Sequence, residues 1–116
     1  MAQSVRVNGD QTPWLTDRSG EITVQDTDDG LVLHLSGDVE DVVVKHLMAT
    51  CSVDLSRIVA VDVGELAYID STALTLLVRW AEAAAAAGRP AEIRRRTPRF
   101  GRVLEVAGLT TLFVYE

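Results

Sequence analysis

Two stretches near the start of the chain alternate between apolar and polar residues. The first begins at Glu21 as Glu-Ile-Thr-Val-Gln-Asp, and the second is Leu-Val-Leu-His-Leu-Ser-Gly, residues 31–37. Asp-Asp-Gly at positions 28–30 separates them, which is a strong signal for a tight turn. The pattern predicts an antiparallel hairpin with the leucines of the second stretch on one face. His34 falls on the other face, where we interpret it as a surface or packed histidine and not as a ligand.

The next stretch, residues 38–51, has an ambiguous pattern. Its run of three valines from Val42 favours a strand, because β-branched residues are common in strands. Val43, Leu47 and Cys51 instead share one face of a helix, with polar residues in front that suit a helix start. We predict a short helix here, with Cys51 as a small core residue.

In the rest of the chain, apolar residues are spaced in turn as in a strand and as in a helix. Residues 58–63 are nearly all apolar, as expected for a strand covered on both faces, and residues 72–87 carry apolar side chains at helical spacing. We place Leu74, Leu77, Val78, Ala81 and Ala84 on the apolar face of that helix. Residues 91–95 predict a strand, Thr97-Pro98 predicts a helix start, Gly108 its end, and residues 112–115 a last short strand.

The order of these elements predicts a single α/β domain with a mixed β-sheet. The hairpin lies at one side of the sheet, and right-handed β-α-β crossovers make the later strands parallel. We assign residues 21–116 to this domain. Residues 1–20 have no sustained periodicity, so we interpret them as an N-terminal arm whose order the sequence does not define.

Length and composition fit such a domain. The chain has 116 residues, of which 47% are hydrophobic and 24% charged. One cysteine allows no internal disulfide and favours a reducing compartment. The first residues do not have the pattern of a signal peptide, and no stretch approaches the roughly 20 apolar residues of a membrane span. We therefore expect a cytoplasmic protein that does not insert into membranes.

Charge narrows the choice of partner. The formal net charge is −6, which argues against nucleic acid as the main partner. Six of the eleven basic residues nevertheless lie between Arg89 and Arg102. This cluster, which includes Arg94, Arg95, Arg96 and Arg99, is open to two interpretations: a solvated face around a helix start, or a dock for an acidic protein.

The polar junction Asp70-Ser71-Thr72 interrupts the apolar run just where the long helix is predicted to begin. Asp and Ser are both preferred helix caps, which gives the junction a purely structural interpretation. A helix N-terminus also offers free amides and a positive dipole end that tolerate a phosphate. From spacing alone, both interpretations stay open.

Three segments together resemble the STAS domain, specifically the stand-alone anti-sigma factor antagonists of bacteria. The first is Val-Asp-Val-Gly-Glu-Leu-Ala-Tyr-Ile-Asp-Ser-Thr-Ala-Leu, from Val61. The second is Leu-Ser-Gly-Asp-Val-Glu, from Leu35, and the third is the run from Thr97 to Phe113. They occur in the family's order, and the resemblance covers about residues 21–116.

The resemblance implies a role for each matching position. Ser71 falls at the serine that the partner kinase phosphorylates, Asp70 at the acid before it, and Thr72 at the second hydroxyl residue. Glu40 falls where the family has Asp. Three positions depart from the family pattern: Ala73 replaces a glycine, Gly64 replaces a serine, and Glu40 is one methylene longer than Asp.

The expected function is therefore that of a binding module and not of an enzyme, with no cofactor and no metal. Unphosphorylated family members bind an anti-sigma factor that is also a serine kinase and so free a sigma factor in transcription or stress regulation; a protein serine phosphatase would reverse the modification. Because ligand sites gather at the carboxyl ends of parallel strands, Asp38 is expected beside the same helix start. The predicted partner-binding residues are Asp38, Glu40, Asp70, Ser71, Thr72 and Ala73.

Two alternatives to this first hypothesis remain. STAS domains also serve as small subunits of lipid-transport ABC complexes and as parts of stress-sensing scaffolds. A hydrolase that uses Ser71 with His34 or His46 is the third hypothesis. It lacks the small residues that a nucleophile elbow needs on both sides of the serine.

Overall fold

The computed structural model describes residues 3–8, 20–50 and 54–115, and for residues 3–8, 49 and 50 it describes the backbone alone. Residues 1–2, 9–19, 51–53 and 116, among them Cys51, lie outside the described residues. The elements are β1 (Gln3–Asn8), β2 (Glu21–Thr27), β3 (Gly30–Val39), α1 (Asp41–Thr50), η1 (Leu55–Arg57), β4 (Ile58–Ile69), α2 (Ser71–Ala86), β5 (Glu92–Arg94), α3 (Pro98–Ala107), η2 (Thr110–Leu112) and β6 (Val114–Tyr115).

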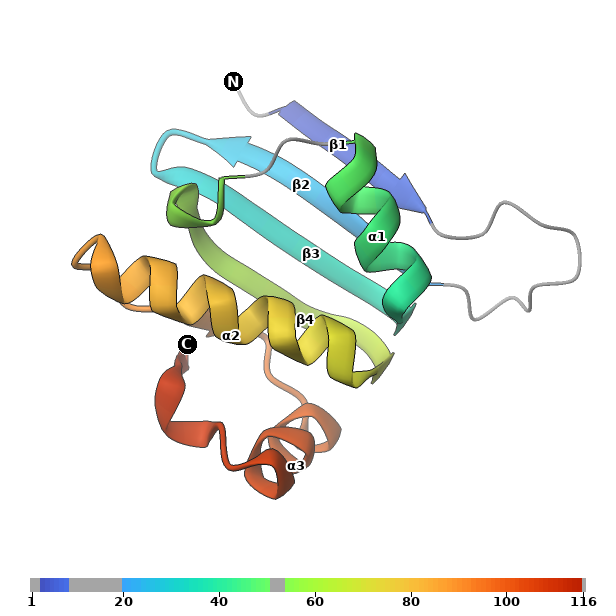
Figure 1. Cartoon of the computed structure of the whole chain (residues 1–116), viewed down its shortest axis with the longest axis vertical. Coiled ribbons are helices and arrows are strands. Elements are labelled where there is room, and N and C mark those ends of the chain that lie inside the picture. Colours follow the sequence, from blue (N-terminus) through green and yellow to red (C-terminus); the bar gives the residue numbers. More distant parts are fainter. Residues whose placement is uncertain (1–2, 9–19, 51–53, 116) are drawn as a thin grey trace, which may run out of the picture.

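The strands form one six-stranded sheet in the order β1-β2-β3-β4-β5-β6. β1, β2 and β3 pair antiparallel, and each later neighbour pairs parallel. Figure 1 shows α1 and α2 on the same face of the sheet. This confirms the predicted α/β fold, with its antiparallel hairpin and its β-α-β crossovers.

β1 is the strand that the sequence did not predict. It extends the hairpin by pairing with β2, from Gln3 opposite Asp26 to Asn8 opposite Glu21. Its pattern, Gln-Ser-Val-Arg-Val-Asn, has only two apolar positions, too few to separate a short strand from a loop. The strand forms where β2 offers an edge with unpaired backbone groups, which is a tertiary cause that local pattern does not reveal.

The ambiguous stretch after β3 is helical, as predicted. Within α1, Val43 and Leu47 are buried together with Val44. The valine run therefore serves the buried face of a helix, because packing against the sheet outweighs the weak strand preference of β-branched residues.

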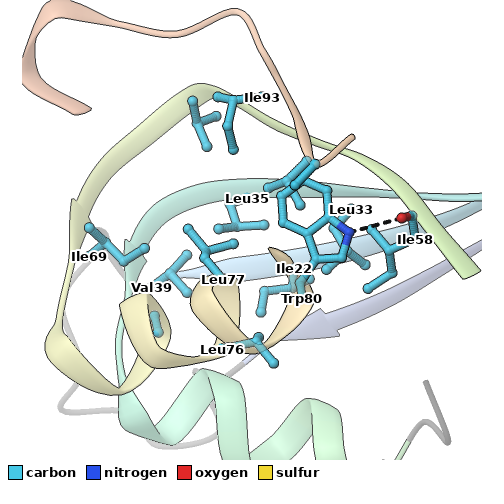
Figure 2. Close-up of a cluster of buried hydrophobic side chains, with 14 of the residues drawn as sticks. Ile22, Leu33, Leu35, Val39, Ile58, Ile69, Leu76, Leu77, Trp80 and Ile93 are labelled. Atoms are coloured by element: carbon cyan, nitrogen blue, oxygen red, sulfur yellow. Dashed lines mark hydrogen bonds between the residues drawn. The ribbon is translucent and has the colours of Figure 1, made fainter. Parts of the chain in front are cut away.

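The hydrophobic core lies between the sheet and the helices (Figure 2). Trp80 of α2 is almost wholly buried, donates from Nε1 to the carbonyl oxygen of Ile58 at 2.9 Å, and stacks on Phe113 with ring centroids 6.0 Å apart. The buried face of α2 is rotated from the predicted one. It contains Leu76 and Trp80, while the predicted Leu74 and Val78 are only partly buried.

β4 is longer than predicted. It runs from Ile58 to Ile69, whereas the apolar pattern predicted a strand that ends at Val63. Gly64 and Glu65 interrupt the apolar run, yet β3 continues to pair with β4 as far as Val39 opposite Ile69, with bulges that absorb the irregularity. β5 is short and pairs with β4 only as far as Asp62.

Candidate functional site

The carboxyl ends of β3 and β4 bring the predicted site residues to one edge of the sheet. Val39 pairs with Ile69, and the backbone nitrogen of Asp70 donates to the carbonyl oxygen of Val39 at 3.3 Å. α1 begins two residues after Val39, and α2 two residues after Ile69. The starts of two helices therefore lie side by side at this edge (Figure 1).

Asp70 caps both of these helices. Its Oδ1 accepts from the backbone nitrogen of Ala73 at 2.9 Å, which makes Asp70 the N-cap of α2. Its Oδ2 accepts from the backbone nitrogen of Asp41, the first residue of α1, at 2.8 Å. Of the two cap candidates at the junction, Asp70 and not Ser71 is the cap, because its two carboxylate oxygens each accept from an amide of a different helix.

Ser71 is the exposed first residue of α2. Its carbonyl oxygen accepts from Thr75 Oγ1 at 2.8 Å, while its own hydroxyl makes no hydrogen bond within the described part of the chain. The hydroxyl thus stands free at the positive end of a sixteen-residue helix, where an added negative charge is tolerated.

The other predicted residues differ in their exposure at this edge. Glu40 is exposed directly before α1, and its carbonyl oxygen accepts from the backbone nitrogen of Val44 at 3.1 Å. Asp38 is half-buried and pairs in register with Tyr68. Thr72 is half-buried, and Ala73 is only 1% exposed. Ala73 therefore contributes to this edge through its backbone and not through its side chain.

The arginines of the cluster have different partners. Arg94 pairs with Glu92 on the same strand, and the guanidinium of Arg96 lies 4.5 Å from the ring centre of Tyr115. Arg99 Nη1 donates to the carbonyl oxygen of Ala67 at 3.1 Å. These arginines therefore have different structural roles, and any docking role falls to those without a carboxylate partner.

Arg95 holds a buried acid that the sequence did not single out. Its Nε donates to both carboxylate oxygens of Asp62 at 2.9 Å, and its Nη1 lies 3.5 Å from Glu65 Oε1. The hydrogen bond to Asp62 raises the pKa of Arg95. Arg95 also has a left-handed φ of 54°, uncommon for a residue other than glycine. Gly64 makes room for this arginine, because a Cβ there would lie 2.6 Å from the guanidinium.

His34 belongs to the same network on the sheet. Its Nδ1 lies 3.7 Å from Asp62 Oδ2, and its Nε2 lies 2.9 Å from Gln25 Oε1. Asp62 is 8% exposed, and its Oδ1 also accepts from the backbone nitrogen of Gly64 at 2.9 Å. The sequence showed only an acid within an apolar strand. Its partners come from β3 and from the segment after β5, so only the fold reveals them.

The described residues contain no group of three or more His, Cys, Asp or Glu side chains placed to hold a metal ion. No helix in the described part of the chain is long and apolar enough to cross a membrane.

Comparisons with solved structures find the same fold in other proteins. SpoIIAA, a cell-fate determinant of Bacillus whose structure was solved in the phosphorylated form, superposes with a TM-score of 0.61 at 16% identity, over 82% of this chain and 90% of that one. A Thermotoga maritima protein, proposed to be an anti-sigma factor antagonist, superposes with a TM-score of 0.54 at 16% identity, over 80% and 84%. At this identity the likeness shows the shared fold.

The curated protein sequences contain no match to this chain. A family model described as "Mlab, STAS domain" matches residues 22–115, which is most of the chain. The chain belongs to the STAS-domain family.

Proposed function

We propose that this protein is an anti-sigma factor antagonist that binds its anti-sigma factor while Ser71 is unmodified and releases it when Ser71 carries a phosphate. The observation that carries the proposal is the exposed Ser71 hydroxyl at the start of α2, which no described residue engages. Asp70 already accepts from the amides of Ala73 and Asp41, so the serine is not needed as a cap.

The surroundings of Ser71 suit a charge-operated switch. A phosphate adds about 1.5 to 2 negative charges, and the α2 amides and dipole offset part of the repulsion from nearby carboxylates. The fold therefore tolerates the modification. A partner surface that packs over Ser71 and Glu40 has no such compensation, so the same charge weakens the complex.

The partner in this proposal is an anti-sigma factor with serine kinase activity, and a protein serine phosphatase restores the binding form, all within the cytoplasm. The domain itself acts as a binding module. His34 sits five residues before the end of β3, roughly 17 Å from the edge that holds Ser71, where it contacts Gln25 and Asp62. That separation argues against the hydrolase hypothesis for the Ser71–His34 pair.

The direct test is phosphorylation by purified anti-sigma kinases from the organism that encodes this chain. Each kinase is incubated with ATP and the wild-type protein, and the phosphate is mapped by mass spectrometry. We expect one phosphate on Ser71 and none on Ser71→Ala. Equal phosphorylation of Ser71→Ala would move the acceptor elsewhere, with Thr72 as the next candidate.

A second candidate keeps the fold and changes the partner: a STAS subunit of a lipid-transport ABC complex, or of a stress-sensing scaffold. The observation in its favour is that the matching family model is named for Mlab and not for an anti-sigma factor antagonist. Purification of the tagged protein under native conditions separates the two. Co-purification of a membrane-bound ATPase complex supports the second candidate, and co-purification of a small kinase supports the first.

A further inference from the structure

A groove lies along the last part of β4, next to the Ser71 edge. β5 stops pairing at Asp62, so residues 63–69 of β4 have no strand neighbour on that side among the described residues. α3 approaches this unpaired edge instead. Between them a hollow of about 80 Å³ is lined by residues 66–69, Arg99, Phe100 and Val103.

The groove combines an apolar floor with two residue types that dominate protein interfaces. Tyr68 is 52% exposed, and its hydroxyl has no partner within the described residues. Arg99 is exposed, has one N–H on the carbonyl oxygen of Ala67, and pairs with no carboxylate of the described chain. Tyrosine and arginine are enriched among the residues that contribute most to binding energy.

We infer that this groove, the β4–α3 groove, receives a branched aliphatic side chain of the protein partner, with a partner carboxylate next to it on Arg99. The inference rests on the proposed function and specifies the partner's contact surface. Ile69, which lines the groove, precedes Ser71 by two residues, so a partner that covers Ser71 can extend onto this groove.

Size and charge define the occupant. A hollow of about 80 Å³ is smaller than the ~150 Å³ apolar cavities that hold a benzene ring, so it favours an aliphatic side chain over an aromatic one. Arg99 keeps four further N–H donors in a planar fork, which matches a carboxylate. A basic residue at that position on the partner would be repelled by the positive charge of Arg99.

The chemistry of the groove is tested with synthetic peptides, independently of any kinase. Three peptides are titrated while the methyl signals of Val103 and Leu66 are followed by NMR: a leucine flanked by glutamates, the same leucine flanked by lysines, and an alanine flanked by glutamates. We expect saturable shifts with the first peptide only. Arg99→Glu should abolish them, whereas Arg79→Glu, which reverses an exposed arginine on α2, should not. Equal shifts with the lysine peptide, or none with the first, would overturn the inference.

The role of the groove in the complex is tested with the kinase that phosphorylates Ser71. Arg99→Glu and the groove-filling Ala67→Leu should each weaken its affinity at least tenfold, with Arg79→Glu within twofold of wild type. If Ser71 is phosphorylated and affinity is unchanged in both groove variants, the proposed function stands and the groove inference fails. If no kinase acts while the first peptide binds as expected, the proposed function fails and the groove serves a different acidic partner.

Discussion

Asp70 and Asp41, which lie 29 residues apart in sequence, join two helices: the Asp70 carboxylate accepts the backbone N–H of Asp41 at 2.8 Å. The other oxygen of the same carboxylate accepts the N–H of Ala73. One side chain therefore fixes the starts of α1 and α2 relative to each other. The edge that presents Glu40 and Ser71 depends on this double cap.

Loss of the double cap should destabilise the protein. We expect Asp70→Ala to lower the free energy of unfolding by about 2–4 kcal/mol, because two helix amides lose a charged acceptor. Asp70→Asn should cost less, since its amide oxygen still accepts one of the two bonds. Urea unfolding followed by circular dichroism measures both, with Glu82→Ala on the exposed side of α2 as the matched control. A change no larger than the control's would contradict the capping role.

The buried Asp62 should make Arg95 a stability residue. We expect Arg95→Ala to lower the free energy of unfolding more than an exposed surface substitution does, because Asp62 stays buried after losing its charged donor. Arg79→Ala, at an exposed position on α2, should change it by less than about 0.5 kcal/mol. Thermal and urea unfolding of the two variants compare them directly. Equal stability would show that the ion pair is dispensable.

Glu40 should affect binding and not folding. Its side chain is exposed and makes no hydrogen bond or ion pair within the described residues, while its backbone serves α1. We expect Glu40→Ala to weaken the affinity for the anti-sigma kinase about two- to fivefold, the range of an exposed charge contact. Stability should stay within about 0.5 kcal/mol. Unchanged affinity and unchanged Ser71 phosphorylation would remove Glu40 from the interface.

Asp54 should contribute to the acid sensitivity of the fold. Hydrogen bonds from the hydroxyl and the backbone nitrogen of Ser56 lower the pKa of Asp54 below its usual 3.8. A carboxyl group whose pKa is lowered by folding stabilises the protein above its unfolded pKa, and that contribution is lost as the pH falls through the folded pKa. NMR titration of Asp54 should show the lowered midpoint, and Ser56→Ala should raise it. An equal midpoint in both proteins would exclude the hydroxyl as the cause.

Much of the fold followed from the apolar pattern. The hairpin, α1, α2 and α3 were predicted because each has a period or an end signal of its own. The N-cap Thr97 and the left-handed Gly108 are the end signals of α3. β1 and the second half of β4 were missed, because both form against a neighbouring strand and have weak patterns of their own. The local sequence does not reveal such pairing with a neighbouring strand.

The features of the candidate site were likewise predicted only in part. The resemblance pointed to Ser71, and the parallel strands predicted that Asp38 and Glu40 would lie at the same edge. The double cap by Asp70, the Arg95–Asp62 pair and the β4–α3 groove were not predicted, since each joins segments distant in sequence. To predict them one would have to know the register of β4 against β3 and β5.

The affinity of the anti-sigma kinase for this protein before and after phosphorylation tests the switch most directly. Calorimetric titration should give a dissociation constant that rises about tenfold to a thousandfold when Ser71 carries a phosphate, because a like charge at a partly dried interface costs about 1–4 kcal/mol. Ser71→Glu should fold normally and bind as weakly as the phosphorylated form, and Ser71→Ala should bind like the unmodified protein. Equal affinities for the phosphorylated and unmodified forms would show that charge on Ser71 is not the switch.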